Sequence, residues 1–298
     1  MSGSSTSSLQ REKHLKRRAS KVSIGVSNLL MIIFALYFMF PIVWLMCSTT
    51  KSTSELHNSG IFELGSSLVA NVKWLNTYSG GIFWKWILNS LIISLVSASI
   101  SVIVSSMGGY ALTKYRFKLS GVISAVSFGS MMVPQAATVI PLFLMIKQFN
   151  LVNTYTGVIL PMIASPFGLY FMTVYLKSSV PNELIDSGRV DGAGDMRIFW
   201  KIALPIMKPG LVTLFLIAFT TSWNNFFLPL VLLNKEAYYP STVGLKLWVS
   251  NLRGQGVGEP MYPLVMLGAF ISIFPMLLLF TFMRKYITSG ITMGSVKT

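Results

Sequence analysis

Residues 86–112 read WILNSLIISLVSASISVIVSSMGGYAL. This stretch contains no Asp, Glu, Lys or Arg, and it is longer than the ~20 helical residues that cross a bilayer core of ~30 Å. Apolar and polar residues do not alternate with a period of two, so helices are favoured over barrel strands. Five further stretches share these properties, at 22–46, 121–146, 157–176, 209–233 and 261–283. The sequence therefore predicts an all-α polytopic membrane protein with six transmembrane helices.

The composition agrees with a membrane protein. The 298 residues are 53% hydrophobic and 11% charged, whereas a soluble domain has about 25% charged residues. A net charge of +15 suggests nucleic acid, but the charges lie in short segments between the apolar stretches. We therefore expect a lipid bilayer, and no nucleic acid, as a partner. One cysteine and two histidines argue against a disulfide framework and a metal site.

Basic residues are distributed unequally between the connecting segments. With the N-terminus inside, seventeen Lys and Arg residues are cytoplasmic and seven are external. The positive-inside rule then places both termini in the cytoplasm. The expected order is an N-terminal tail (1–21), a first helix (22–46), an external segment (47–85), a five-helix core (86–286) and a C-terminal tail (287–298). The core includes a cytoplasmic loop at 177–209 and an external loop at 234–260.

The predicted spans lack the groups that several functions need. They contain no ionisable side chain of the kind that binds a coupling ion, although carbonyl groups can also bind Na⁺, which keeps a secondary carrier open. They offer no His-Glu-x-x-His and no buried carboxylate for hydrolysis. A Gly-x4-Gly-Lys-(Ser/Thr) loop for ATP phosphates is also absent. We therefore expect no catalytic residue, no cofactor and no enzyme activity in this chain.

The spans do carry uncharged polar residues. Trp223, Asn224 and Asn225 fall in the fifth span, where amides are costly unless they face a partner helix or water. An aromatic ring beside amide groups suits a sugar, because the ring stacks on its C–H face while the amides bond its hydroxyls. Interhelical packing explains these residues equally well. Weaker candidates for a translocation pathway are Gln135, Thr138 and Ser165.

The segment VPNELIDSGRVDGAGDMRIFWKIALP, at 180–205, differs from the other connecting segments. Ser179 or Asn182 can cap a first short helix, and Asp195 a second, with a glycine-rich turn between them. Pro205 is expected to end the second helix before the fifth span. Two short helices at the membrane surface would present a rigid knob to a cytoplasmic partner.

This segment resembles the signature loop of binding-protein-dependent ABC importer permeases, which reads Glu-Ala-Ala, three residues, Gly, nine residues, Ile-x-Leu-Pro. Here Asp-Ser-Gly at 186–188, Gly192 and Ile-Ala-Leu-Pro at 202–205 keep every interval. The flanking residues, and WNNF at 223–226, are similar to the carbohydrate branch and its smaller, maltose-type permease subunit. The departure at Gly188 costs about 1 kcal/mol of helix propensity relative to Ala, so the first helix is expected to be less stable.

The resemblance implies a type I ABC importer permease fold (methionine-permease-like) with one extra N-terminal helix, in a prokaryotic plasma membrane. It implies a second permease subunit, two ATPase subunits that bind ATP and Mg, and an external solute-binding protein, which the glycine-rich run at 254–258 would reach. The residues expected to couple to an ATPase subunit are Glu183, Asp186, Ser187, Gly188, Arg189, Asp191, Gly192, Ile202, Leu204 and Pro205.

The function expected from the sequence is the permease subunit of an ATP-driven sugar or oligosaccharide importer, forming half of the translocation pathway. One alternative is an ABC importer permease for a peptide, an amino acid or a metal complex. The other is a secondary carrier or channel subunit, which would need no ATPase.

Overall fold

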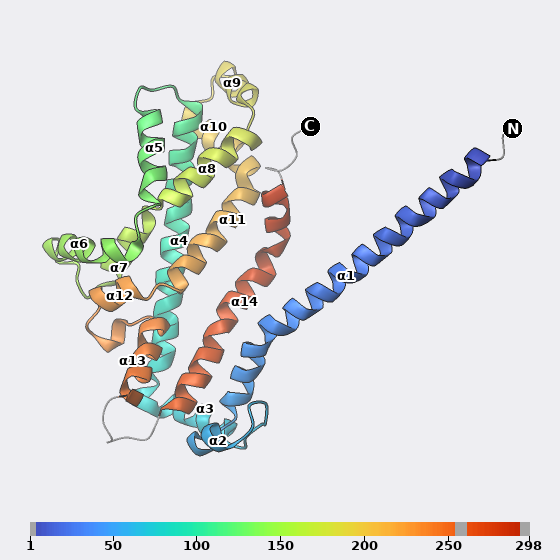
Figure 1. Cartoon of the computed structure of the whole chain (residues 1–298). Coiled ribbons are helices and arrows are strands. Elements are labelled where there is room, and N and C mark those ends of the chain that lie inside the picture. Colours follow the sequence, from blue (N-terminus) through green and yellow to red (C-terminus); the bar gives the residue numbers. More distant parts are fainter. Residues whose placement is uncertain (1–3, 254–260, 293–298) are drawn as a thin grey trace. The chain divides into compact units, whose positions relative to one another are not determined.

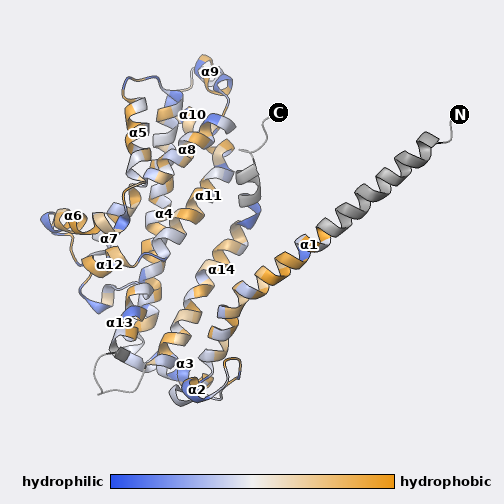
Figure 2. Cartoon of the chain, viewed as in Figure 1, coloured by the Kyte–Doolittle hydropathy of each residue, from blue (hydrophilic) through white to orange (hydrophobic). Residues whose placement is uncertain are grey.

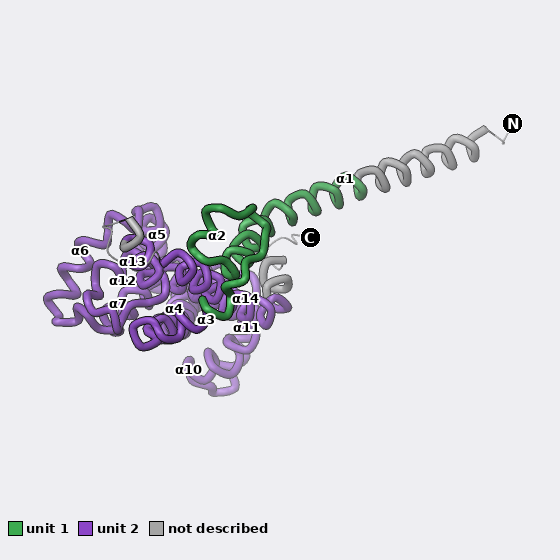
Figure 3. Tube along the Cα trace, turned by 90° about the horizontal axis from the view of Figure 1, so that it is seen from below, with its two compact units in different colours: residues 1–71 green, residues 72–298 purple. Residues whose placement is uncertain are grey.

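The computed structural model describes residues 4–253 and 261–292. The glycine-rich run at 254–258 and the ends of both predicted tails lie outside the described residues. The chain forms two units, residues 1–71 and 72–298 (Figure 3). Among the described residues, all regular secondary structure is helical. The all-α fold class predicted from the apolar stretches is therefore confirmed.

The first unit contains one long helix, α1 (Ser4–Thr49), followed by the short α2 (Thr53–Asn58). The helix α1 includes the first predicted span and most of the predicted N-terminal tail. A capping box starts α2: the Ser52 hydroxyl accepts from the Glu55 N–H, and the Glu55 carboxylate accepts from the Ser52 N–H at 2.6 Å. The predicted external segment therefore begins as ordered structure.

The second unit is a helical bundle in which α4 lies against α8 and α11, and α11 lies against α14 (Figure 1). Figure 2 shows apolar residues along α11 and α14, two helices that contain predicted spans. The helices of this unit, with α3 crossing the division, are α3 (Leu68–Thr77), α4 (Ile82–Lys114), α5 (Ser120–Ser130), α6 (Gln135–Gln148), α7 (Tyr155–Ile163), α8 (Pro166–Ser179), α9 (Asn182–Val190), α10 (Asp195–Ile198), α11 (Leu204–Trp223), α12 (Phe227–Leu232), α13 (Ser241–Arg253) and α14 (Tyr262–Thr292). Single turns η1 (Tyr78–Gly80), η2 (Phe199–Ala203, a π-helical turn) and η3 (Glu236–Tyr238) join them.

Five segments of the described chain are long and apolar enough to span a membrane, and a sixth counts if a bent pair is one span. The bent pair is α5 and α6, and the chain bends by 110° between them. The sequence predicts one span over this region, at 121–146. The break falls just before Pro134, which precedes α6 with an extended ψ of 130°. Proline lacks an N–H and disfavours helical backbone in the residue before it, which explains the break.

The fifth span differs from its prediction at both ends. Pro205 does not end a helix, because α10, η2 and α11 follow one another without interruption from Asp195 to Trp223. The π-helical turn accommodates this arrangement: the Leu204 N–H donates to the Phe199 carbonyl, five residues back. The helix then stops at Trp223, so the predicted stretch at 209–233 ends in a separate short helix, α12.

The predicted external loop at 234–260 is also not a simple loop, because η3 and α13 lie within it. The start of α4 holds this segment. The Trp86 indole N–H donates to the Glu236 carbonyl at 2.9 Å, and the Asn89 amide donates to the Ala237 and Tyr239 carbonyls, both at 2.9 Å. Hydrogen bonds from α4 therefore hold η3 and the residue after it against the bundle.

Candidate functional site

The loop with the signature spacing folds as α9, a tight turn, and α10 continuing into α11. Gly192 sits in the turn at φ +76°, in the left-handed region that favours glycine. The turn is closed by the Ala193 N–H, which donates to the Gly188 carbonyl at 3.0 Å. No side chain caps α9, because Pro181 is its N-cap, and Gly194 rather than Asp195 caps α10. The first predicted short helix is present as α9, the second is the start of a helix that continues into α11, and the predicted caps are wrong.

Gly188 lets the two arms of the loop approach each other. It is buried, and a Cβ there would lie 3.0 Å from Ile202 Cδ1 and 3.2 Å from Ile198 Cγ1. The sequence pointed only to a loss of helix propensity at this position. The structure adds a reason for glycine, because a larger side chain would separate α9 from the α10–η2 arm.

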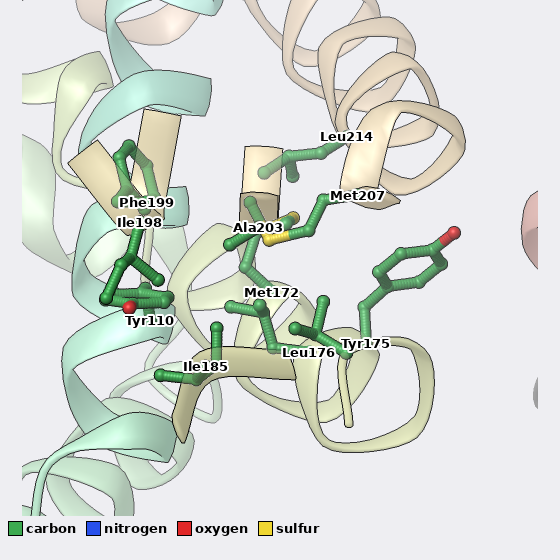
Figure 4. Close-up of a cluster of buried hydrophobic side chains, with 11 residues drawn as sticks. Tyr110, Met172, Tyr175, Leu176, Ile185, Ile198, Phe199, Ala203, Met207 and Leu214 are labelled. Atoms are coloured by element: carbon green, nitrogen blue, oxygen red, sulfur yellow. The ribbon is translucent and has the colours of Figure 1, made fainter. Parts of the chain in front are cut away.

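A hydrophobic cluster anchors the loop to the bundle (Figure 4). Ile185 of α9 and Ile198 of α10 are 1% and 0% exposed. They pack with Tyr110 of α4 and with Met172 and Leu176 of α8. The close packing of this cluster attaches α9 and α10 to α4 and α8.

Charged groups pair across the same turn. The Arg189 guanidinium lies 3.3 Å from the Asp186 carboxylate and 3.4 Å from the Asp195 carboxylate. These side chains are 40%, 67% and 47% exposed, so each pair adds little stability on its own. Partial burial, followed by a hydrogen bond to Asp195 and the charge of that carboxylate, raises the pKa of Tyr115. Arg189 thus joins α9 to α10.

The remaining predicted coupling residues divide by burial. Glu183, Ser187, Asp191 and Pro205 are exposed, while Ile202 and Leu204 are partly buried against the hydrophobic cluster. Their role in coupling stays a prediction. Sequence reasoning missed the exposed apolar side chains on the same loop, which are Leu184, Val190, Met196 and Trp200 at 42%, 87%, 59% and 47% exposure.

Lys114 is another residue that sequence reasoning missed. Its ammonium donates to the Val180 carbonyl at 2.5 Å and to the Asn182 side-chain oxygen at 2.8 Å. Lys114 is the last residue of α4, and Asn182 is the first of α9. The bonds therefore connect the end of α4 directly to the loop. A basic residue two positions after the predicted span at 86–112 was the available signal, because cations are favourable at helix C-termini.

A cavity of about 620 Å³ opens between α4, α6, α7, α8 and α11. Four of the predicted pathway residues line it: Gln135, Thr138, Ser165 and Asn225. Trp223 and Asn224 do not. Trp223 is 4% exposed and stacks on Phe219 with ring centroids 5.7 Å apart, and Asn224 is exposed and donates to the Thr220 carbonyl at 3.0 Å.

Two serines of α4, Ser97 and Ser101, are also among the residues that line the cavity. Ser97 Oγ lies 2.6 Å from the Ile93 carbonyl and 3.0 Å from Ser222 Oγ of α11. Ser222 Oγ in turn lies 3.6 Å from the Met162 sulfur of α7. This series of contacts joins three helices at the cavity wall, so Ser97 serves packing and lining together.

Comparison with known proteins agrees with this architecture. Residues 105–293 match the family described as "Binding-protein-dependent transport system inner membrane component". The arabinooligosaccharides transport system permease protein of Bacillus subtilis is 33% identical over 91% of this chain and 94% of its own length. The lactose transport system permease protein of Rhizobium radiobacter is 34% identical over 87% of this chain and 90% of its own length.

A solved structure has the same fold. It is described as a bacterial ABC transporter involved in the import of the acidic polysaccharide alginate, and the matching chain superposes with a TM-score of 0.78 and 25% identity over 91% of this chain and 98% of that one. The helical bundle, its candidate spans and its projecting loop define a multi-pass membrane permease subunit of an ABC transporter. The chain belongs to the family of binding-protein-dependent transport system inner membrane components.

Proposed function

We propose that this chain is a permease subunit of an ATP-driven importer for a neutral or acidic sugar or oligosaccharide, and that it contributes half of the translocation pathway. The relatives named for arabino-oligosaccharides and lactose support the cargo class. The observation that carries the proposal is the α9–α10 loop, which keeps the signature spacing and projects an exposed surface from a rigid base. Peptide, amino-acid or metal-complex cargo is not favoured by these relatives.

The exposed face of the loop is suited to a protein partner. Val190, 87% exposed, directly follows Arg189, whose guanidinium pairs with Asp186, and Trp200, 47% exposed, lies in η2 of the other arm. Apolar side chains ringed by charges are typical of protein interfaces. The partner proposed here is a cytoplasmic ATPase subunit that binds ATP and Mg, one of two in the complex.

The remaining assembly follows from the same proposal. A second permease subunit would complete the pathway, and an external solute-binding protein would deliver cargo. The excess of basic residues in the segments that include the loop supports cytoplasmic placement of the loop and of both termini. In this arrangement α13 faces outward, and the charge-paired α9–α10 loop faces inward.

Co-purification tests the coupling role. The Val190→Asp variant should lose the ATPase subunits from the detergent-solubilised complex, because it places a charge on the exposed apolar tip of α9. Val69→Asp is the matched control, since Val69 is 81% exposed but lies outside the loop. ATPase subunits that stay bound to the Val190→Asp chain, or leave both variants equally, would remove the support for coupling through α9.

Calorimetric titration of the cognate binding protein tests the cargo class. Arabino-oligosaccharides and lactose-type galactosides are expected to bind, while peptides and amino acids are expected to give no heat. Binding of peptides alone would replace the sugar proposal with the first alternative.

A further inference from the structure

The segment between α2 and α3 carries three exposed apolar side chains close together in sequence. Ile61, Phe62 and Leu64, which form the apolar turn, are 57%, 52% and 70% exposed. The turn is closed by the Glu63 N–H, which donates to the Gly60 carbonyl at 3.1 Å. Clustered apolar side chains on a protein surface indicate contact with another protein or with a membrane.

Both ends of the apolar turn are held by the residues that follow α1. The Lys51 ammonium donates to the Gly60 carbonyl at 2.6 Å, and Lys51 is 3% exposed. On the other side, the Gly65 N–H donates to the Thr50 hydroxyl at 2.8 Å. A Cβ at Gly65 would lie 2.5 Å from the Thr50 carbonyl oxygen, so only glycine allows this close approach. The apolar turn therefore has a defined place beside the end of α1.

One contact shows where along α1 the apolar turn lies. The Phe62 ring packs edge-on against the Phe40 ring, with centroids 5.3 Å apart and an interplanar angle of 89°. Phe40 belongs to the candidate span Ile24–Thr49. At ~1.5 Å per residue it lies about 14 Å before the end of that span. The chain after α2 thus returns along α1 to the level of its apolar part.

The length of the span places Phe40 in the hydrocarbon of the membrane. The 26 residues of Ile24–Thr49 extend about 39 Å, whereas the hydrocarbon core is ~30 Å thick. Even with the whole excess of about 9 Å beyond the membrane at the Thr49 end, Phe40 would still lie about 5 Å inside the core. Phe62 contacts this residue from outside the helix, so the apolar turn reaches the boundary between headgroups and acyl chains.

The surroundings of the apolar turn fit lipid at this boundary. Leu36 and Phe38 of α1, 68% and 66% exposed, belong to an apolar surface that the contact between Phe40 and Phe62 continues onto the turn. The exposed Glu63 carboxylate accepts from the Gly60 N–H at 2.9 Å. A charged group is costly at the centre of a bilayer but not at its surface. Apolar side chains beside a charge are typical of segments that lie in the interface.

We propose that the apolar turn inserts into one leaflet of the phospholipid bilayer, between headgroups and acyl chains, beside the C-terminal part of α1. Insertion removes the three side chains from water. The hydrogen bonds from Lys51 and Thr50 connect this anchor to α1, so the turn fixes how deeply that end of the helix is immersed. This inference goes beyond the proposed function, because it depends on neither the cargo nor the ATPase. Under the proposed topology the leaflet is the outer one.

Power-saturation EPR on the complete importer in phospholipid nanodiscs tests the proposal. A nitroxide is attached at Ile61→Cys or Leu64→Cys, with Cys47, the one native cysteine of this chain, replaced by serine and the other subunits free of accessible cysteines. Collisions with oxygen, which partitions into lipid, and with a water-soluble nickel chelate report the depth of the label. The ratio of oxygen to nickel collisions should be several-fold higher at both positions than at Asn58→Cys, an exposed control position at the end of α2. Leu36→Cys, in the apolar part of α1, is the membrane reference and should be deeper still.

Three results would overturn the proposal. Nickel collisions at Ile61 and Leu64 equal to those at Asn58 would show that the apolar turn lies in water. Protection of both labels from oxygen and from nickel would show that a protein, such as the second permease subunit, covers the turn. A label at Leu36 that is open to nickel would show that α1 does not hold the turn at a membrane. Each result would leave the importer proposal to its own test, ATP-dependent sugar uptake.

Discussion

Replacing Gly192 with alanine should loosen the turn between α9 and α10. Gly192 has φ +76°, and no atom lies within 4 Å of a Cβ built there, so the cost of the change is conformational and not steric. For a residue with a Cβ, the left-handed region costs roughly 1–2 kcal/mol. Every 1.4 kcal/mol is a factor of ten in an equilibrium constant. The closed turn should therefore open about five- to thirtyfold more often.

Hydrogen exchange measured by mass spectrometry on the purified importer reads this opening. The Ala193 amide, which donates to the Gly188 carbonyl at 3.0 Å, should exchange faster by that factor, and coupled transport should fall with it. Gly194→Ala is the control, because Gly194 has φ −67° and also has open space at its Cβ. Equal exchange in the two variants would refute the argument that the left-handed turn holds the loop together.

Three further changes test other parts of the account. Trp223→Ala should destabilise the permease by about 3–5 kcal/mol, as expected for a buried aromatic residue. Thermal unfolding in detergent measures this loss. An unchanged unfolding temperature together with lost transport would instead favour a role for Trp223 in the translocation pathway. The Lys114→Ala variant should retain ATP hydrolysis but import less sugar per ATP hydrolysed, because it removes the hydrogen bonds from α4 to Val180 and Asn182. Lys118 is exposed, so the control variant Lys118→Ala should match the wild type. Hydrogen bonding by the Ser52 N–H lowers the pKa of the Glu55 carboxyl from its ordinary value of 4.5. The ionised carboxylate should therefore stabilise the α2 cap at pH values above 4.5, and this stabilisation should be lost as the pH falls through the lowered pKa of the folded state. A ¹³C carboxyl titration with a midpoint at or above 4.5 would contradict this.

The spans were predictable because lipid imposes a simple requirement on composition. The charge-free stretch at 86–112 lies inside α4, which runs Ile82–Lys114. The end of the fifth span was not predictable, since the stretch stays apolar through 233 while the helix stops at Trp223. Hydropathy reports solubility in lipid and not backbone direction, so it does not register a break without a charge or a proline.

The amphipathic helix α13 was missed for a related reason. It is too short to span a membrane, and it lies in a segment that reads as a connection between spans. Its signal was Val243 and Leu247, four residues apart, followed by Trp248; Val243 and Trp248 are 2% and 1% exposed. Apolar residues at i and i+4 mark a packed helix face. The length of an apolar stretch distinguishes a membrane span from a connecting segment, but it does not identify short helices that pack within a connecting segment.

The candidate site divides in the same way. The loop spacing predicted the turn at Gly192, because fixed intervals between glycines and apolar residues reflect one local geometry. The wall of the cavity was harder to predict, since Ser101 of α4, Gln135 of α6 and Asn225, between α11 and α12, are far apart in sequence and meet only in the folded bundle. Trp223 and Asn224 adjoin Asn225 in sequence but do not line the cavity, because the Trp223 ring stacks on Phe219 and the Asn224 amide donates to the Thr220 carbonyl.

Uptake of labelled sugar into proteoliposomes shows whether this permease belongs to an ATP-driven importer. The vesicles would contain this permease, its second permease subunit and the ATPase subunits, with the binding protein added outside and ATP enclosed. We predict uptake that requires both ATP and the binding protein and that is lost in the Val190→Asp variant. Uptake that persists without ATP and binding protein, or that is unchanged in this variant, would contradict an importer driven through the α9–α10 loop.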